Sequence, residues 1–516
     1  MTYSFDLIDQ PWIPCVGLNQ RTGELSLRQV FTHARRVRGL AGASPLETAA
    51  LYRLLLAILH SALRGPESAT QWRDLWRAGT WDTPWLHEYL DRWKHRFDLF
   101  DPQRPFYQVI EDRMAEKPAL QLVHGMGTAN ELFEHESITE DRILNSRQAA
   151  ITLLVAQAFG LGGLCHPQLK ITLTNAPWTR GIIFLVEGDN LFETLALNLL
   201  RYSDGKPLPV IGEDLPAWEM DNPFLPTRNQ PRGYLDYLTW QNRKLLLVPE
   251  DGSDGVIVRK IKIARGLDLD DVRDPWKQYT AKDKGWRHWV FQEDRSLWRD
   301  SHTLFRRHQN DENWPPKTFE WIASLVENGY LDSKQIYRTL ALGMGTHYKD
   351  AKIFFYREEV MPLPLAYFES QNSEELVGLL TDALAWAEKV RGKLWGAVNT
   401  LAKYIASPSL DLPNGRKPDP RDVDKLTDHW AVERFYWGAL ELPFFHLLED
   451  LPKRPQEALD TWKMTLRRTA WNALEQATNL AGDSPAALKA AVRARSMLGG
   501  SLKELFPETI PVEEPV

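Results

Sequence analysis

The stretch Pro362-Leu363-Pro364 divides this chain of 516 residues into two parts of different character. Before it, β-branched and aromatic runs alternate with short helical patterns and with turns rich in glycine and proline, which is typical of mixed helices and sheets. After it, long helical patterns of Ala, Leu, Glu and Lys replace the β-branched runs. Because one hydrophobic core rarely organises so long a chain, we place a domain boundary here and predict domains over residues 1–365 and 366–516.

The part after the boundary predicts a four-helix bundle. Loops that carry proline or glycine separate its helical segments, which we expect at Ser373 to Ile405, Asp422 to Leu448, Arg454 to Ala481 and Pro485 to Leu505. Four such segments in one domain favour a bundle with a shared core.

The part before the boundary opens with helix signals. Ser44-Pro45-Leu46-Glu47 places an N-cap serine, a proline at the first helical position and a glutamate three residues after the cap, and the apolar stripe that follows predicts a helix to Leu63 that is buried on one side. We expect further helices at Ser26 to Phe31, Pro84 to Phe97, Arg147 to Phe159 after an N-cap at Ser146, and Pro316 to Val326.

Strand signals fill the rest of this part. Ser4 to Pro14 has the pattern of a short strand followed by a proline loop. Other strands are expected at Lys170 to Thr174, Gly181 to Val186, Lys244 to Pro249, Val256 to Ala264, Ala351 to Tyr356 and, with helical ambiguity, Ile336 to Met344. The predicted fold class is therefore α+β: a large N-terminal mixed α/β domain followed by a C-terminal four-helix bundle.

Composition narrows the class of function. The apolar fraction of 43% and the charged fraction of 25% are those of a globular protein, and the 21 tryptophans are expected to be mostly core anchors. The runs Leu51 to Leu63 and Ile151 to Phe159 are interrupted or too short to cross a membrane, and the N-terminus lacks a secretion signal, so we expect a cytoplasmic protein. A net charge of −7 means that any nucleic-acid contact must be local.

Catalytic and metal motifs are missing from the sequence. No HExxH, Walker A, GxSxG or spaced Cys/His set occurs, and two cysteines cannot form a four-thiolate zinc site or a disulfide framework. Asp300-Ser301-His302 holds the residue types of a hydrolase, but adjacent positions cannot form a triad by themselves. A metal-free hydrolase or transferase with a Trp-rich pocket stays as an alternative, and an assembly scaffold is a second one.

Two stretches suit local contact with a nucleic acid. In Phe159-Gly160-Leu161-Gly162-Gly163, the glycines either cap a helix or let the main chain approach a groove or a phosphate. In Arg259-Lys260-Ile261-Lys262-Ile263-Ala264-Arg265, basic and apolar residues alternate. This strand is either a solvated edge or a contact with DNA backbone or minor groove.

The chain resembles the CasA family, the large subunit of the type I-E CRISPR complex Cascade. The resemblance is carried by Leu7-Ile8-Asp9-Gln10-Pro11-Trp12-Ile13-Pro14 followed by Leu27-Arg28-Gln29-Val30-Phe31, together with the Ser44-Pro45 helix and the glycine stretch. It implies an N-terminal domain of unusual topology and a non-catalytic role. Members inspect double-stranded DNA for the protospacer-adjacent motif (PAM), start strand separation for guide-RNA pairing, and dock a separate helicase-nuclease.

The resemblance also implies site residues. A loop at Leu132, Phe133 and Glu134 would meet the 5′ handle of the guide RNA, with Phe133 at an aromatic position suited to stacking. Residues implied for DNA contact are the loop glycines Gly160, Gly162 and Gly163, then Lys262 as first and Arg265 as second choice for the minor groove, and Tyr348 or Lys349 as a wedge under the first base pair. The implied partners are the backbone and small subunits of Cascade, the guide RNA, the target DNA and the helicase-nuclease, without a metal, a cofactor or a membrane.

Overall fold

The computed structural model describes residues 3–123, 143–166, 169–203, 205–270, 272–282, 285–305, 312–346, 353–371, 373–410 and 415–507. The chain divides into two compact units. Unit 1 comprises Met1–Glu293 and Arg307–Phe368, and unit 2 comprises Asp294–Arg306 and Glu369–Val516. Unit 2 therefore includes a short segment from within the sequence of unit 1, which the change of character at Pro362 did not predict.

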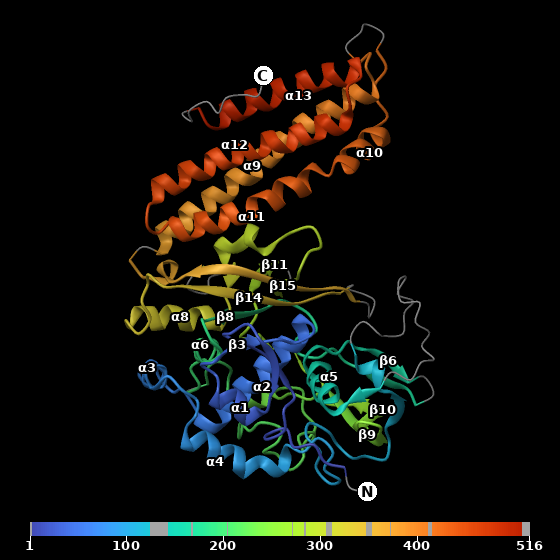
Figure 1. The fold of residues 1–516 in the computed structure, drawn as a ribbon, viewed down its shortest axis with the longest axis vertical. Helices are drawn as coiled ribbons and strands as arrows, with labels where there is room; N and C mark the ends of the chain where they lie inside the picture. Colours follow the sequence, from blue (N-terminus) through green and yellow to red (C-terminus); the bar gives the residue numbers. More distant parts are fainter. Residues whose placement is uncertain are drawn as a thin grey trace. The chain divides into compact units, whose positions relative to one another are not determined.

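Unit 1 mixes helices and small antiparallel sheets (Figure 1). Its described helices are α1 (Leu27–Thr32), α2 (Pro45–Leu63), α3 (Ala69–Ala78), α4 (Pro84–Trp93), α5 (Ser146–Phe159), α6 (Leu191–Leu197), α7 (Tyr234–Leu238) and α8 (Lys317–Glu327), with 3-10 turns η1 (Lys94–Arg96), η2 (Ala119–Leu122) and η4 (Leu365–Phe368). Its described strands are β1 (Ile13–Gly17), β2 (Thr22–Leu25), β3 (Val37–Leu40), β4 (Ala115–Pro118), β5 (Leu144–Asn145), β6 (Gly163–His166), β7 (Ile171–Leu173), β8 (Ile183–Glu187), β9 (Arg243–Gly252), β10 (Gly255–Arg265), β11 (Tyr279–Lys282), β12 (Gly285–His288), β13 (Asn313–Trp314), β14 (Ile336–Thr346) and β15 (Ile353–Pro364).

The strands join into sheets with the orders β2-β1-β3, β4-β10-β5, β12-β11-β13, β15-β14-β8 and β6-β7, and β9 also pairs with β10. The strands predicted at Lys244 to Pro249 and Val256 to Ala264 are β9 and β10, which pair as an antiparallel hairpin. The strand predicted at Ile336 to Met344, where the sequence also allowed a helix, is a long strand that extends to Thr346 and pairs with β15 from Ile336↔Pro364 to Thr346↔Ile353. Together with the helices of unit 2, this content makes the fold class α+β, as predicted.

Helix α2 is the core element of unit 1. Its N-cap is Ser44, whose hydroxyl accepts from the Glu47 N–H at 3.3 Å, as the sequence predicted. The sequence predicted that α2 is buried on one side. In the structure, residues on nearly every side of the helix are buried, including Arg53 and His60. A helix that is apolar all round belongs in a core. Among the described helices, α2 alone is long and apolar enough to cross a membrane, and 83% of its apolar window is buried inside the protein.

Two predicted boundaries in unit 1 were wrong. The N-cap of α5 is Asn145 rather than Ser146, because the Asn145 side chain accepts from the Gln148 N–H at 2.9 Å and the Gln148 side chain accepts from Asn145 N–H at 3.1 Å. The opening segment makes a single β-bridge, between Asp6 and Asp98, in place of the predicted strand, and then a turn in which the Asp6 carboxylate accepts from the Ile8 N–H at 2.9 Å. The first strand begins only at Ile13, after the proline.

Unit 2 is a bundle of long helices. Its elements are η3 (Leu297–Thr303), α9 (Ser373–Ala406), α10 (Pro420–Trp430), α11 (Val432–Asp450), α12 (Pro455–Ala481) and α13 (Pro485–Leu505). Figure 1 shows α9, α11, α12 and α13 side by side. The predicted helix from Asp422 to Leu448 is broken at Ala431, whose left-handed backbone (φ 48°) ends α10 and begins α11. Buried aromatics bond to α9: Trp462 Nε1 donates to the Ala383 carbonyl at 2.9 Å.

Candidate functional site

The glycine loop, defined as Gly160–Gly163, leaves the end of α5 and enters the small β6–β7 hairpin. Gly160 is buried, and both of its polar backbone groups are bonded within the chain. Its N–H donates to Ala156 O at 3.1 Å, and its carbonyl accepts from Ala176 N–H at 2.9 Å and from the Thr179 hydroxyl at 2.8 Å. The base of the loop is therefore closed, and Gly160 has no free backbone group to offer a ligand.

The other two glycines lie further out. Gly162 is partly exposed, and its N–H donates to the Asn175 side chain at 2.7 Å. Gly163 is exposed and has a φ of 145°, a conformation that side-chain-bearing residues rarely adopt. Gly163 then pairs with Leu173 of β7. Of the three predicted glycines, these two present main chain at the surface.

A buried arginine lies beneath the loop. The Arg243 side chain is at the start of β9 and its residue is only 3% exposed. Its guanidinium donates to the carbonyls of Leu161 at 2.6 Å, Ala156 at 3.3 Å and Thr174 at 3.3 Å, and to the Asn242 side chain at 2.7 Å. Burial lowers the pKa of Arg243 to about 10. No carboxylate within the described ranges forms an ion pair with it, so carbonyl oxygens satisfy the cation.

The cations of β10 differ in whether a carboxylate neutralises them. Lys260 Nζ lies 2.8 Å from the Glu116 carboxylate, Arg259 lies 3.4 Å from Glu250, and Arg265 lies 2.5 Å from Asp268. In the described part of the chain, Lys262 alone of these four has no ion-pair partner. A β-bulge between Val258 and Lys260 interrupts the alternation of faces that the sequence predicted at Arg259.

The glycine loop and β10 belong to one piece of structure. In the β9–β10 ladder, Arg243 stands opposite Arg265, and Lys262 stands opposite Leu246 on β9 and Glu116 on β4. Figure 1 shows α5, β6, β9 and β10 close together in unit 1. Sequence reasoning found both stretches but missed Arg243. A single arginine at the start of a strand carries no signal for its contact with a glycine more than 80 positions earlier.

Two predicted sites lie outside the described residues. They are the guide-handle residues Leu132, Phe133 and Glu134, and the wedge residues Tyr348 and Lys349. After the guide-handle residues, the described chain resumes at Ile143. The wedge residues lie in the sequence between the end of β14 and the start of β15.

The hydrolase alternative receives no support from the geometry. Asp300, Ser301 and His302 lie on η3 in unit 2. The Asp300 carboxylate is held by Arg295 through two bonds of 2.7 Å, and Ser301 is 0% exposed, so a substrate cannot reach its hydroxyl. The described residues also include no group of three or more His, Cys, Asp or Glu side chains that could hold a metal ion. Cys15 is buried and Cys165 is half-buried, and both are free thiols.

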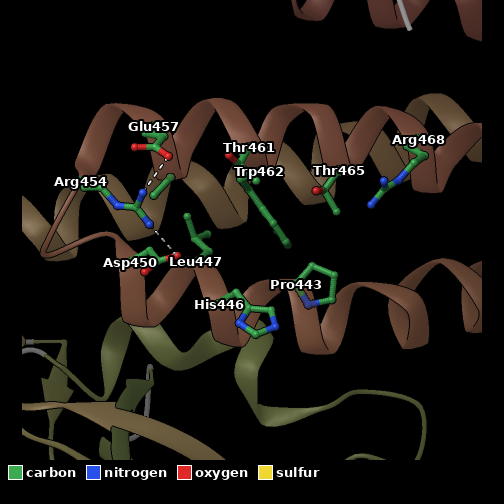
Figure 2. Close-up of a pocket in the computed structure, with 11 residues that line it drawn as sticks. Pro443, His446, Leu447, Asp450, Arg454, Glu457, Thr461, Trp462, Thr465 and Arg468 are labelled. Carbon is green, nitrogen blue, oxygen red and sulfur yellow. Dashed lines mark hydrogen bonds and ion pairs between the residues drawn. The ribbon is translucent and has the colours of Figure 1, made fainter. Parts of the chain in front are cut away.

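A cleft of about 230 Å³ opens between α11 and α12 in unit 2. Figure 2 shows Arg454 at one end of it, where its guanidinium lies 2.9 Å from the Glu457 carboxylate and 3.7 Å from that of Asp450. Trp462 points into the space between the helices and His446 lies at its edge. Arg454 is shared between these two carboxylates, and none of the described residues places a hydroxyl or thiol in hydrogen-bond contact with His446. The cleft therefore lacks a nucleophile with its base.

Comparison with known proteins gives a consistent result. A family model described as CRISPR-associated protein Cse1 matches residues 6–473. The CRISPR-associated protein CasA/Cse1 of Thermus thermophilus is 31% identical over 519 residues, which cover 98% of this chain and 98% of that protein. The crystal structure of Thermus thermophilus CasA superposes with a TM-score of 0.80 at 30% identity, over 97% of this chain and 100% of that one. A chain of a CRISPR RNA-guided surveillance complex shares the fold, with a TM-score of 0.74 at 20% identity over 96% of this chain and 99% of that one.

Proposed function

Since the chain belongs to the CRISPR-associated protein Cse1 family, we propose that it acts as the large, non-catalytic subunit of a type I-E Cascade complex and recognises the PAM in double-stranded DNA. In this division of labour, guide RNA reads the long target sequence by base pairing, while protein contacts to a short motif permit entry. The proposal needs a small local contact surface, which suits a chain with a net charge of −7.

The proposal is carried by two features of one structural element: exposed glycine main chain, and a lysine that forms no ion pair among the described residues and lies on the other face of the β9–β10 ladder from Arg243. Gly162 and Gly163 offer backbone that can approach a groove closely, because no side chain stands in the way. Lys262 forms no ion pair among the described residues, although its charge acts on the nearby Glu116 carboxylate, which Lys260 engages. A lysine ammonium group binds phosphate or minor-groove acceptors. Gly160 supports the loop from below, and Arg265, which is paired with Asp268, ranks after Lys262.

We place strand separation at the residues that join β14 and β15, with Tyr348 or Lys349 as the wedge. The two strands pair over their whole length, and β8 pairs with β14 on its other edge. A long, doubly paired hairpin of this kind can hold the residues that join its strands against the strain of opening a base pair.

The remaining partners follow from membership of the family. We propose that Leu132, Phe133 and Glu134 meet the 5′ handle of the guide RNA, that the backbone and small subunits bind this chain, and that it docks the helicase-nuclease in the cytoplasm. The buried Ser301 and the Arg295-bound Asp300 support a role without catalysis.

The test is equilibrium binding of guide-loaded complex, assembled with and without this chain, to duplexes that contain the guide-matched sequence. One duplex carries the PAM and a matched control carries a scrambled motif. We expect binding that depends on both the chain and the motif. Equal affinity for the two duplexes would refute PAM recognition. If the complex binds the PAM duplex equally well with and without this chain, the chain would be only an assembly scaffold.

A further inference from the structure

Arg243 is an unusual core residue because its buried charge has no carboxylate partner in the described structure. Placing a cation in a core costs several kcal/mol unless hydrogen bonds compensate, and most buried charges are paired with an opposite charge. Here the compensation comes from carbonyls that belong to three segments: the end of α5 at Ala156, the glycine loop at Leu161, and the exit of the β6–β7 hairpin at Thr174. One planar group thus ties both ends of the loop and hairpin together.

Gly160 makes room for this group. Its backbone angles, φ −58° and ψ 130°, are open to any residue, so the conformation does not require glycine. A Cβ at Gly160 would instead lie 2.5 Å from Arg243 Nη1 and from Ala156 O, closer than carbon atoms of side chains normally approach. Gly160 and Arg243 therefore form a packing pair, in which the missing side chain leaves space for the guanidinium.

The main chain of Arg243 fixes the other side of the contact. The Gln157 side chain of α5 donates to Arg243 O at 2.8 Å and accepts from Arg243 N–H at 3.4 Å. Arg243 also stands opposite Arg265 in the ladder that carries Lys262. Arg243 therefore contacts the glycine loop through its guanidinium and β10 through its main chain.

We propose that Arg243 is a positioning residue for motif recognition: its guanidinium holds the main chain of the glycine loop at a fixed place relative to Lys262 on β10. The inference rests on the proposed function, and it assigns to Arg243 no contact with DNA. Its planar fork is what the role requires, because several diverging carbonyls must be held at once.

The test compares three variants of this chain in the guide-loaded complex: Arg243→Gln, Arg243→Lys and Gly160→Ala. The readout is the ratio of dissociation constants for scrambled-motif and PAM duplexes. We expect Arg243→Gln to lower this ratio about tenfold, equal to about 1.4 kcal/mol, with little change in binding to the scrambled duplex. Arg243→Lys keeps the charge but loses the fork, and it should recover only part of the ratio. Gly160→Ala should lower the ratio with the arginine still present.

Arg53→Gln is the matched control. Arg53 is 5% exposed, and its guanidinium also donates to main-chain carbonyls, those of Leu238 and Tyr237, without a bond to the glycine loop. Both glutamine variants should lower the melting temperature, but only Arg243→Gln should lower the ratio. In hydrogen exchange of the free chain, the amides of Gly162 and Ala176 should lose protection in Arg243→Gln and keep it in Arg53→Gln.

The outcomes distinguish failure of the proposed function from failure of the positioning role of Arg243. If wild-type complex does not distinguish the duplexes, the proposed function fails and the role of Arg243 falls with it. If wild type distinguishes them and Arg243→Gln or Gly160→Ala distinguishes them equally well, the positioning role alone is overturned. The same holds if Arg243→Lys behaves as wild type, since charge and not geometry would then suffice. Should Arg243→Gln fail to fold, Arg243→Lys and Gly160→Ala still decide the question.

Discussion

Replacing Lys262 by alanine tests whether this cation of β10 binds DNA. Lys262 is partly exposed at the centre of the strand, and the Glu116 carboxylate opposite it is already engaged by Lys260 at 2.8 Å. A hydrogen bond from a charged donor contributes about 1.5–3 kcal/mol, so Lys262→Ala should weaken PAM-duplex binding by about 10- to 150-fold. Folding stability should change by less than about 0.5 kcal/mol, because the site is not in the core.

Lys260→Ala is the matched control on the same face of the same strand. Its ion pair with Glu116 is exposed to solvent, which screens it, so the pair stabilises the fold little. Dissociation constants are measured at several salt concentrations, and log affinity is plotted against log salt concentration. If Lys262 contacts a phosphate, the magnitude of the slope should be about one unit smaller for Lys262→Ala than for wild type. Wild-type affinity in Lys262→Ala, or an equal loss in Lys260→Ala, would refute the assignment.

Three further predictions concern stability. Burial lowers the pKa of His60 from its ordinary 6.5 to about 4, so between these values the unfolded chain binds a proton that the folded chain does not. The free energy of unfolding, measured with urea, should therefore fall by up to about 3 kcal/mol from pH 6.5 to pH 4. The fall should be smaller in His60→Leu. Trp298→Ala removes a 2% exposed ring stacked on Phe444 at 4.6 Å, and should lower the unfolding free energy of unit 2 by about 3–5 kcal/mol; a loss below 1 kcal/mol would contradict this packing. Ala431→Gly should raise the melting temperature, since glycine relieves about 1 kcal/mol of left-handed strain; a lower one would contradict this.

Local chemistry made the start of α2 predictable. Ser44 with Pro45 and Glu47 specifies the first turn of α2 through groups within three residues, and the structure has the helix there. The opening strand was predicted wrongly because Asp6 competes with the ladder by capping its own turn, an effect that a period-two pattern does not reveal.

Contacts between distant residues were not predictable from one sequence. Asp294–Arg306 belongs to unit 2, where Trp298 stacks on Phe444, and Arg243 packs against Gly160. Hydrophobic periodicity reports which face of an element is buried but not which distant element covers it. Residue type alone suggested the chemistry of the glycines and the β10 cations, which stay predictions as site residues, but it gave no signal for the contact of Arg243 with the glycine loop.

The most direct test of motif recognition is a photocrosslink from position 262. A diazirine-bearing lysine analogue replaces Lys262 in the guide-loaded complex, and the same analogue at position 260 serves as the control. We predict that the position 262 crosslink maps to the base pairs of the PAM and disappears with the scrambled duplex. A crosslink that maps elsewhere on the DNA, or one that is as strong without the motif, would contradict the proposal that β10 and the glycine loop recognise the PAM.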